Sequence, residues 1–302
     1  NLQGSVPSYT TAPVSEWLGS HVYAALGIPV HETVLGIRDG RIVCACRDFT
    51  FPDSRLVNFH DLKNSLSDDE PGFTEDASTG SGVVLADVRS AIHRIPVLRS
   101  IDGVSDRFWD MFVVDAFIRN IDRNNTNWGV LRNPRGEFSL APVYDNGNSF
   151  NNKRTDSGIE RRLANPDLIR QDALDVRSCY VTDRGKPIAP LKYLASGQDE
   201  ECTKALDRFM ERYDPRSFHD LLGSIPSMSH GLTVVPDGFH EYHRRVCDYR
   251  YEHAFMEAWR DLHPTVGVPS SPEASVPEPL PDPDPSVLPS SSVPTCFDGP
   301  GM

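Results

Sequence analysis

The sequence predicts an α+β fold, and three stretches of residue pattern carry this prediction. A helical pattern over 15–26 leads into a β-hairpin pattern over 33–46. A second helical pattern over 105–121 leads into a second hairpin over 128–143, and several helical patterns follow between 168 and 262. The length of 302 residues allows one large domain or two lobes with a sizeable core. We expect a small helix-and-hairpin part followed by a larger, mostly helical part.

The first part is expected to be one helix followed by one hairpin. Ser15 can cap a helix that runs to Leu26, and Gly27 ends it. The apolar runs 33–37 and 41–46 surround Asp39-Gly40, which is a strong signal for a two-residue hairpin turn. Downstream, the stretch 67–82 is acidic and rich in Ser, Gly and Asp, which indicates a mobile loop.

The next elements are two helices and a hairpin. We expect a helix over 83–95, ended by Pro96, and a helix over 105–121, in which Asp115 and Arg119 can pair across one turn. Two strands, 128–132 and 138–143, then flank a Pro- and Gly-containing turn. Pairing about this turn places Asn127 opposite a residue near Pro142, so that Asp145 lies within roughly 10 Å of it, at ~3.3 Å per residue.

Oxygen ligands are concentrated at the open end of this hairpin. Asp122 and Asn127 have the D-x-x-x-x-N spacing that kinase catalytic loops use for a base and a magnesium ligand, and Asp145 adds a second carboxylate. Magnesium takes oxygen ligands and needs few protein groups when phosphates complete its shell. We therefore interpret Asn127 and Asp145 as magnesium ligands and Asp122 as the group that accepts a proton. Two alternatives explain the same residues: the stretch is a solvated loop capped by its own side chains, or it is a calcium-binding loop.

The stretch resembles the catalytic segment of HipA-like kinases, whose pattern is roughly N-x-D-R-H-x-x-N-W-G, a hairpin and P-x-Y-D. Asn124 stands where that family has His. The resemblance extends upstream to 15–21 and 43–49. The matching positions of the catalytic segment are Asn120, Asp122, Arg123, Asn127, Trp128, Gly129, Pro142, Tyr144 and Asp145.

The resemblance implies a two-lobed protein-kinase-like fold that uses ATP and Mg²⁺. Residues 1–50 would be the remainder of a small N-lobe, 51–263 a helical C-lobe, and 264–302 a disordered Pro/Ser-rich tail. By analogy Glu16 is the helix acid that pairs with a phosphate-binding Lys, or else simply a first-turn acid favoured by the helix dipole. Backbone groups around Arg47 and Phe49 would meet the adenine.

A kinase also needs a Gly-rich loop and an early strand Lys to hold the phosphates, and the first Lys of this sequence is Lys63. We expect these front N-lobe elements to lie upstream of Asn1, to be supplied otherwise, or to have been lost. A basic run over 148–162 could face an acidic or phosphorylated substrate, or be a solvated loop. The last helices are expected over 168–179, 202–213, 217–225 and 239–262.

Composition limits the classes of partner. A net charge of -13 argues against direct nucleic-acid binding. The six cysteines show no zinc-finger spacing, and we interpret them as reduced thiols; Cys44 and Cys46 are expected to face the same side of a strand. No stretch has the apolar length of a membrane span or the pattern of a signal peptide, so we expect a cytoplasmic protein without membrane contact.

We expect the chain to transfer the γ-phosphate of ATP, and the resemblance implies that the acceptor is a Ser or Thr hydroxyl of a protein. Phosphorylation of a phosphoinositide or a small molecule is the alternative for the substrate. The HipA-like resemblance further implies a possible role as the toxin of a toxin–antitoxin pair, with a small DNA-binding antitoxin as partner. The alternative is a catalytically silent kinase-like module that binds a nucleotide or a protein, suggested by the missing early Lys and by Asn124.

Overall fold

The computed structural model describes residues 11–67 and 82–264. Most of the predicted acidic loop over 67–82, and the predicted tail from 265 onwards, lie outside the described residues. None of the described helices is long and apolar enough to cross a membrane.

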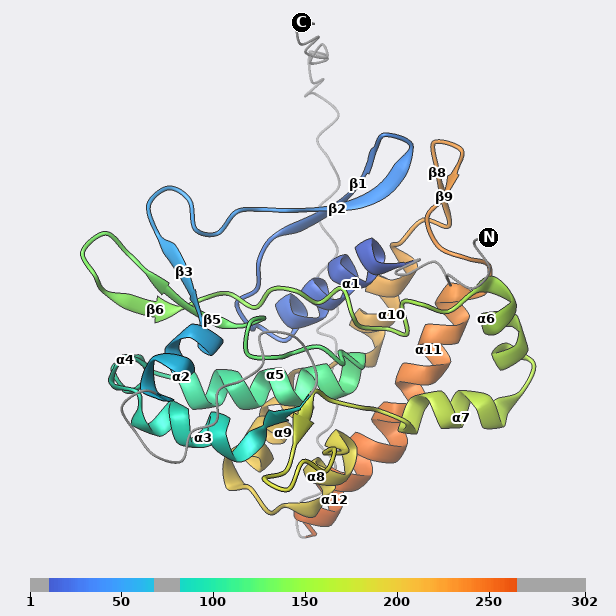
Figure 1. Cartoon of the computed structure of the whole chain (residues 1–302). Coiled ribbons are helices and arrows are strands. Elements are labelled where there is room, and N and C mark those ends of the chain that lie inside the picture. Colours follow the sequence, from blue (N-terminus) through green and yellow to red (C-terminus); the bar gives the residue numbers. More distant parts are fainter. Residues whose placement is uncertain (1–10, 68–81, 265–302) are drawn as a thin grey trace, which may run out of the picture. The chain divides into compact units, whose positions relative to one another are not determined.

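The predicted first helix and hairpin are present. Helix α1 (Ala12–Ala25) begins three residues earlier than expected, because Pro13 fits the first turn of a helix and Ser15 is buried inside the helix instead of capping it. Gly27, with φ +70°, ends the helix as predicted. Strands β1 (Thr33–Arg38) and β2 (Arg41–Cys46) pair antiparallel around Asp39-Gly40, whose φ values of 52° and 68° fit a tight hairpin turn (Figure 1).

A second sheet has three strands in the order β3–β5–β6. Strands β5 (Gly129–Arg132) and β6 (Phe138–Leu140) form the predicted hairpin in the register Val130↔Leu140, which extrapolates to Asn127 opposite Val143. Strand β3 (Arg55–Asn58) was not predicted and pairs with β5. Its close approach requires Gly129, where a Cβ would lie 2.2 Å from the Val57 carbonyl oxygen.

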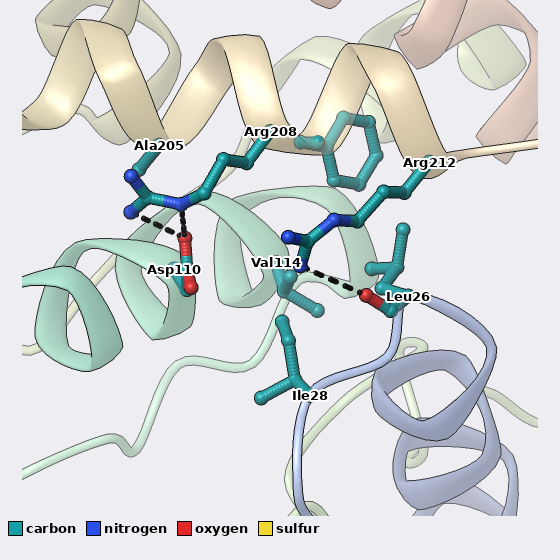
Figure 2. A pocket seen from close by; sticks show the side chains of 8 residues that line it. Leu26, Ile28, Asp110, Val114, Ala205, Arg208 and Arg212 are labelled. Carbon is teal, nitrogen blue, oxygen red and sulfur yellow. Dashed lines mark hydrogen bonds and ion pairs between the residues drawn. The ribbon is translucent and has the colours of Figure 1, made fainter. Parts of the chain in front are cut away.

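Helix α5 (Val104–Ile118) runs through the core and packs against helix α9 (Glu200–Arg212). At this contact the Arg208 Nε donates to Asp110 Oδ1 at 2.8 Å, and Arg212 Nη1 donates to the Leu26 carbonyl at 3.3 Å (Figure 2). The pocket among these side chains has a volume of only about 10 Å³, so α1, α5 and α9 are closely packed there.

The end of α5 differs from the prediction. Arg119 adopts a left-handed conformation with φ 58° and ends the helix before Ile121. Its Nε donates to the Asp175 carbonyl at 3.3 Å, so the expected pair with Asp115 is wrong. Asp115 pairs instead with Arg123 in the following loop.

Most of the remaining helices lie in the C-terminal half of the chain, and the predicted ones are confirmed with shifted ends. The predicted helix over 83–95 is α3 (Leu85–Arg94), because its first residues form the short strand β4 (Val83–Val84), which pairs with β7 (Tyr180–Val181). The predicted helix over 168–179 ends at Leu174. The last predicted helix is continuous but contains one π-helical turn. The other elements are α2 (Phe59–Ser67), α4 (Pro96–Arg99), α6 (Asp156–Leu163), α7 (Pro166–Leu174), α8 (Pro190–Ser196), α10 (Pro215–Gly223), β8 (Met228–Ser229), β9 (Leu232–Thr233), α11 (Phe239–Arg250), η1 (Tyr251–Phe255) and α12 (Met256–Leu262).

Candidate active site

Arg123 connects the two sequence segments of the predicted site. Its Nε donates to Asp115 Oδ2 at 2.9 Å, and one nitrogen, Nη1, donates to the backbone carbonyls of both Asn127 (2.9 Å) and Tyr144. Its Nη2 donates to Asn146 Oδ1 at 2.6 Å. Two carbonyls that share one donor lie at most about 6 Å apart, or two hydrogen-bond lengths. The backbone of Asn127 is therefore held beside the residue that precedes Asp145.

Arg123 is buried and forms an ion pair with Asp115. Arg123 is 1% exposed and Asp115 is 5% exposed. Burial by itself would lower the pKa of Arg123, but the neighbouring Asp115 carboxylate raises it above its ordinary value. Asp115 also accepts from the Tyr23 hydroxyl at 2.7 Å and from Asn120 Nδ2 at 3.2 Å. The guanidinium therefore stays charged, and both partners are satisfied by hydrogen bonds, as a buried ion pair requires.

The carboxylate of Asp122 is held on both oxygens by amide groups. Asn124 Nδ2 donates to Oδ1 and Asn148 Nδ2 donates to Oδ2, each at 2.9 Å. The Asp122 backbone N–H donates to Asn120 Oδ1 at 3.1 Å. Asn124 is fixed in turn, because its Oδ1 accepts from the N–H and the hydroxyl of Thr126 at 2.9 and 2.6 Å. Asn124, which replaces the His of the HipA-like pattern, therefore orients the proposed base.

The two predicted magnesium ligands belong to adjacent backbone segments. Asn127 Nδ2 donates to the Asp122 carbonyl at 2.8 Å, so its Oδ1 is the atom left for a cation. The Thr126 hydroxyl oxygen lies 3.2 Å from this Oδ1, but its one proton is directed at Asn124 Oδ1, so both lone pairs of the Asn127 oxygen remain for an ion. Asp145 follows in a left-handed conformation with φ 58°, immediately after Tyr144.

The electrostatics at Asp145 fit a cation. Burial raises the pKa of Asp145 above its ordinary value, and the nearby charges of Glu16 and Asp122 act in the same direction, while Arg123 and His31 oppose them. The excess of negative charge would be relieved by a dication. Hard oxygen donors in a negatively charged site are the environment that Mg²⁺ takes in proteins.

Glu16 joins this site through groups that the sequence pattern did not identify. Its Oε2 accepts from the Asn146 backbone N–H at 2.8 Å, and its Oε1 accepts from His31 Nε2 at 2.8 Å. Asn146 can approach α1 because Gly19 has no side chain: a Cβ there would lie 2.8 Å from the Asn146 Cβ. Asn146 Nδ2 also donates to Ser20 Oγ at 3.0 Å. Glu16 therefore anchors the Asp145 segment to α1.

The residues predicted to meet an adenine lie on the chain segment after β2. The Arg47 backbone N–H donates to the Glu32 carbonyl at 2.9 Å, so an adenine would have to use other backbone groups of this segment. Arg47 Nη1 pairs with Glu32 Oε1 at 2.8 Å, an exposed contact. The Phe49 ring lies 5.6 Å from the ring of Tyr144 and 6.5 Å from that of His31, between centroids. Phe49 therefore lies beside the residue that precedes Asp145.

Two arginines of the basic run over 148–162, Arg154 and Arg162, form ion pairs inside the protein. Arg154 Nη2 donates to Asp172 Oδ1 at 2.6 Å, and the Arg162 Nε donates to Asp172 Oδ2. The Tyr242 hydroxyl donates to the same carboxylate at 2.6 Å. Arg154 and Arg162 thus neutralise one buried aspartate between α6, α7 and α11, which contradicts the suggested substrate role for these two side chains.

Sequence reasoning missed Asn146 and Asn148, because Asp-Asn-Gly-Asn is an ordinary turn signal when only the sequence is considered. It also missed His31, which stands in no local motif. The sequence offered one signal for Asn146 and Asn148: several asparagines stand near Asp122 and Asp145, which were already candidate site residues.

The chain is similar to a known kinase in sequence and in fold. No known family profile matches the sequence. The serine/threonine-protein kinase CtkA of Helicobacter pylori (strain J99 / ATCC 700824) is 34% identical over 224 residues, which are 74% of this chain and 66% of that protein. The chain therefore spans about two thirds of the length of this curated relative.

Two solved structures were compared as well. The crystal structure of a Helicobacter pylori proinflammatory kinase CtkA matches with a TM-score of 0.75 and 29% identity, covering 85% of this chain and 89% of that one. A complex of HipA, HipB and operator DNA from a Shewanella oneidensis MR-1 toxin–antitoxin system gives a TM-score of 0.45 and 13% identity, over 82% of this chain and 57% of that one.

Proposed function

The chain belongs to the family of HipA-like serine/threonine kinases that includes CtkA, and from this premise we propose that it transfers the γ-phosphoryl group of ATP to a Ser or Thr hydroxyl of a protein. One observation carries the proposal: the Asp122 carboxylate is held on both oxygens by amides, beside an arginine that binds the backbones of Asn127 and Tyr144. Phosphoryl transfer requires mainly such positioning together with neutralisation of charge.

Asp122 accepts the proton of the incoming hydroxyl. Its partners Asn124 and Asn148 are donors that do not titrate, so they fix the direction of the carboxylate without competing for the proton. Each carboxylate oxygen has a second lone pair, so it can accept the substrate proton while it keeps its hydrogen bond from the amide. Asn148 lies on the segment after Asp145 and Asn124 lies within the catalytic loop, so both segments help to position the base.

Asn127 and Asp145 would hold magnesium, which when bound neutralises the phosphate oxygens and the charge that develops during transfer. The protein's own contribution is to hold the backbone segments of Asn127 and Asp145 next to each other before the ion arrives. Arg123 does this through the Asn127 and Tyr144 carbonyls, and Glu16 does it through the Asn146 N–H. We assign the nucleotide to the space beside Glu16, Arg47 and Phe49.

Two variants separate the assigned roles. Asp145→Ala removes magnesium-dependent ATP binding, measured by calorimetry, while Asp122→Ala leaves that binding within a few-fold and removes turnover. Asp220→Ala, an exposed position on α10, is the matched control and keeps both properties. Turnover by Asp122→Ala at the parent rate would show that Asp122 is not the base.

The second candidate is the catalytically silent module, and Asn124 in place of the family His is the observation that favours it. ATP binding that depends on magnesium and on Asp145, without transfer to any substrate or to the chain itself, would establish it. The small DNA-binding antitoxin and the toxin role stay predictions. Co-purification of the chain with the product of an adjacent reading frame tests them.

A further inference from the structure

Three side chains of different chemistry meet next to the proposed active site. They are Glu16 on α1, His31 in the segment before β1, and Cys46 at the end of β2. One ligand atom from each lies within 4.8 Å of the other two. Glu16 Oε1 and His31 Nε2 are already 2.8 Å apart. Neighbouring members are 15 positions apart in the sequence, which is why no metal-binding spacing could be recognised there.

The backbone around the cluster holds these residues in place. The His31 N–H donates to the Val143 carbonyl at 3.0 Å, which fixes the segment before β1 against the chain that leads to Asp145. Cys46 pairs with Thr33 across the hairpin, so its position is set by the β1–β2 register. The second oxygen of Glu16 accepts from the Asn146 N–H at 2.8 Å. A hydrogen bond of this kind orients a carboxylate ligand and supports metal sites from outside.

The donor set selects one class of ion. A thiolate sulfur, an imidazole nitrogen and a carboxylate oxygen are the ligands of zinc, whereas magnesium takes oxygen alone. Bonds of about 2.0–2.3 Å in a tetrahedron place the ligand atoms roughly 3.3–3.8 Å apart. Atoms within 4.8 Å of one another reach this arrangement through shifts of about 1 Å. Cys46 is exposed, so an ion can reach its sulfur from solvent.

We propose that Glu16, His31 and Cys46 form a binding site for a zinc-class divalent cation, separate from the oxygen pair of Asn127 and Asp145. On binding, the Cys46 thiol gives its proton to solvent and the thiolate sulfur becomes a ligand. The ring proton that His31 Nε2 shares with Glu16 Oε1 moves through solvent to Nδ1. The imidazole stays neutral, and Nε2 and the freed carboxylate oxygen can both bind the ion. With three protein ligands, the fourth position is open to water or to another ligand. The bound ion links α1 to the end of β2, the two elements that carry Glu16 and lead into Arg47.

Cobalt(II) is the probe for this site, because a Co²⁺–thiolate bond gives a near-ultraviolet charge-transfer band that neither oxygen ligation nor nucleotide binding produces. The full chain, reduced and without nucleotide, is expected to take up one equivalent of Co²⁺ with this band. Zn²⁺ is expected to abolish the band, and excess Mg²⁺ to leave it unchanged. Since no nucleotide or transfer is involved, the result does not depend on the proposed kinase activity.

The variants identify the ligands. Cys46→Ser is expected to lose the band, and His31→Gln to weaken Co²⁺ affinity by at least about tenfold. Cys44→Ser is the matched control, since Cys44 lies on the same strand and outside the three-residue cluster, and it is expected to keep the band. Thermal unfolding without metal verifies that each variant is folded. A wild-type chain without the band, a band that persists in Cys46→Ser, or an equal loss in Cys44→Ser would overturn the assignment.

Discussion

Replacing Arg123 by Met is expected to destabilise the protein strongly, because it removes the cation that neutralises a buried aspartate. The change leaves Asp115, which is 5% exposed, without its ion-pair partner. Breaking a buried ion pair on one side costs about 3–5 kcal/mol. Asp115 keeps bonds from the Tyr23 hydroxyl and from Asn120, so we expect the lower end of that range, about 3 kcal/mol. For a protein of this size this corresponds to a fall in Tm of roughly 6–12 °C.

The assay is urea unfolding followed by circular dichroism, together with thermal unfolding of the same samples. Arg135→Met is the matched control, because Arg135 is exposed in the β5–β6 turn, and its effect should stay within about 0.5 kcal/mol. In the double variant with Asp115→Asn, the loss of stability should be smaller than the sum of the single losses by roughly 0.5–3 kcal/mol. Equal stabilities of the Arg123 and Arg135 variants would refute this account of the buried pair.

Three further changes test other parts of the structure. Gly129→Ala should cost about 1–3 kcal/mol or more, because its Cβ would lie 2.2 Å from a carbonyl oxygen of β3; urea unfolding measures this. Burial lowers the pKa of His243 to about 3, and the charge of Arg250 adds to this. Below about pH 6.5 the unfolded chain therefore binds a proton at His243 that the native protein does not bind. The free energy of unfolding should fall by up to about 1.4 kcal/mol per pH unit as the pH drops from 6.5 towards 3. His243→Phe should remove this contribution. Asn148→Ala should lower kcat by up to about 100-fold at nearly unchanged ATP affinity, because Asp122 loses one of its orienting bonds.

Each of these has its own control. Gly223→Ala, at a helix end where a Cβ meets nothing within 4 Å, should be neutral or slightly stabilising. His230→Asn, at an exposed position, should keep the pH dependence of the parent. A Gly129 variant as stable as the parent, a pH slope that persists in His243→Phe, or an Asn148 variant with parental kcat would each contradict the corresponding argument.

The elements with local signals could be predicted from the sequence. The hairpin around Asp39-Gly40, the helix before the catalytic loop and the β5–β6 register follow from turn chemistry and periodicity, and the structure confirms them. Strand β3 could not be predicted, because it is four residues long and is defined by pairing with a strand some seventy residues later.

Candidate site residues were predictable where they stand close together in sequence, as Asp122 and Asn127 do. The residues that hold these side chains in position were not predictable, because they come from distant parts of the sequence. Arg123 could pair with several acids by spacing alone, and only the left-handed end of α5 brings it to Asp115. The amides that hold Asp122 and the cluster of Glu16, His31 and Cys46 likewise depend on how distant segments pack.

We propose that Asp122 and Asp145 carry phosphoryl transfer from ATP. This is measured as transfer of labelled γ-phosphate in the presence of Mg²⁺, to the chain itself and to a lysate, by residues 1–302 and by the same residues within their natural reading frame. Asp122→Asn and Asp145→Asn are compared with the parent in both forms. We predict transfer by at least one parent form and its loss, by at least about 100-fold, in both of its variants. Transfer that survives in both variants, or its absence from both parent forms, would contradict the account.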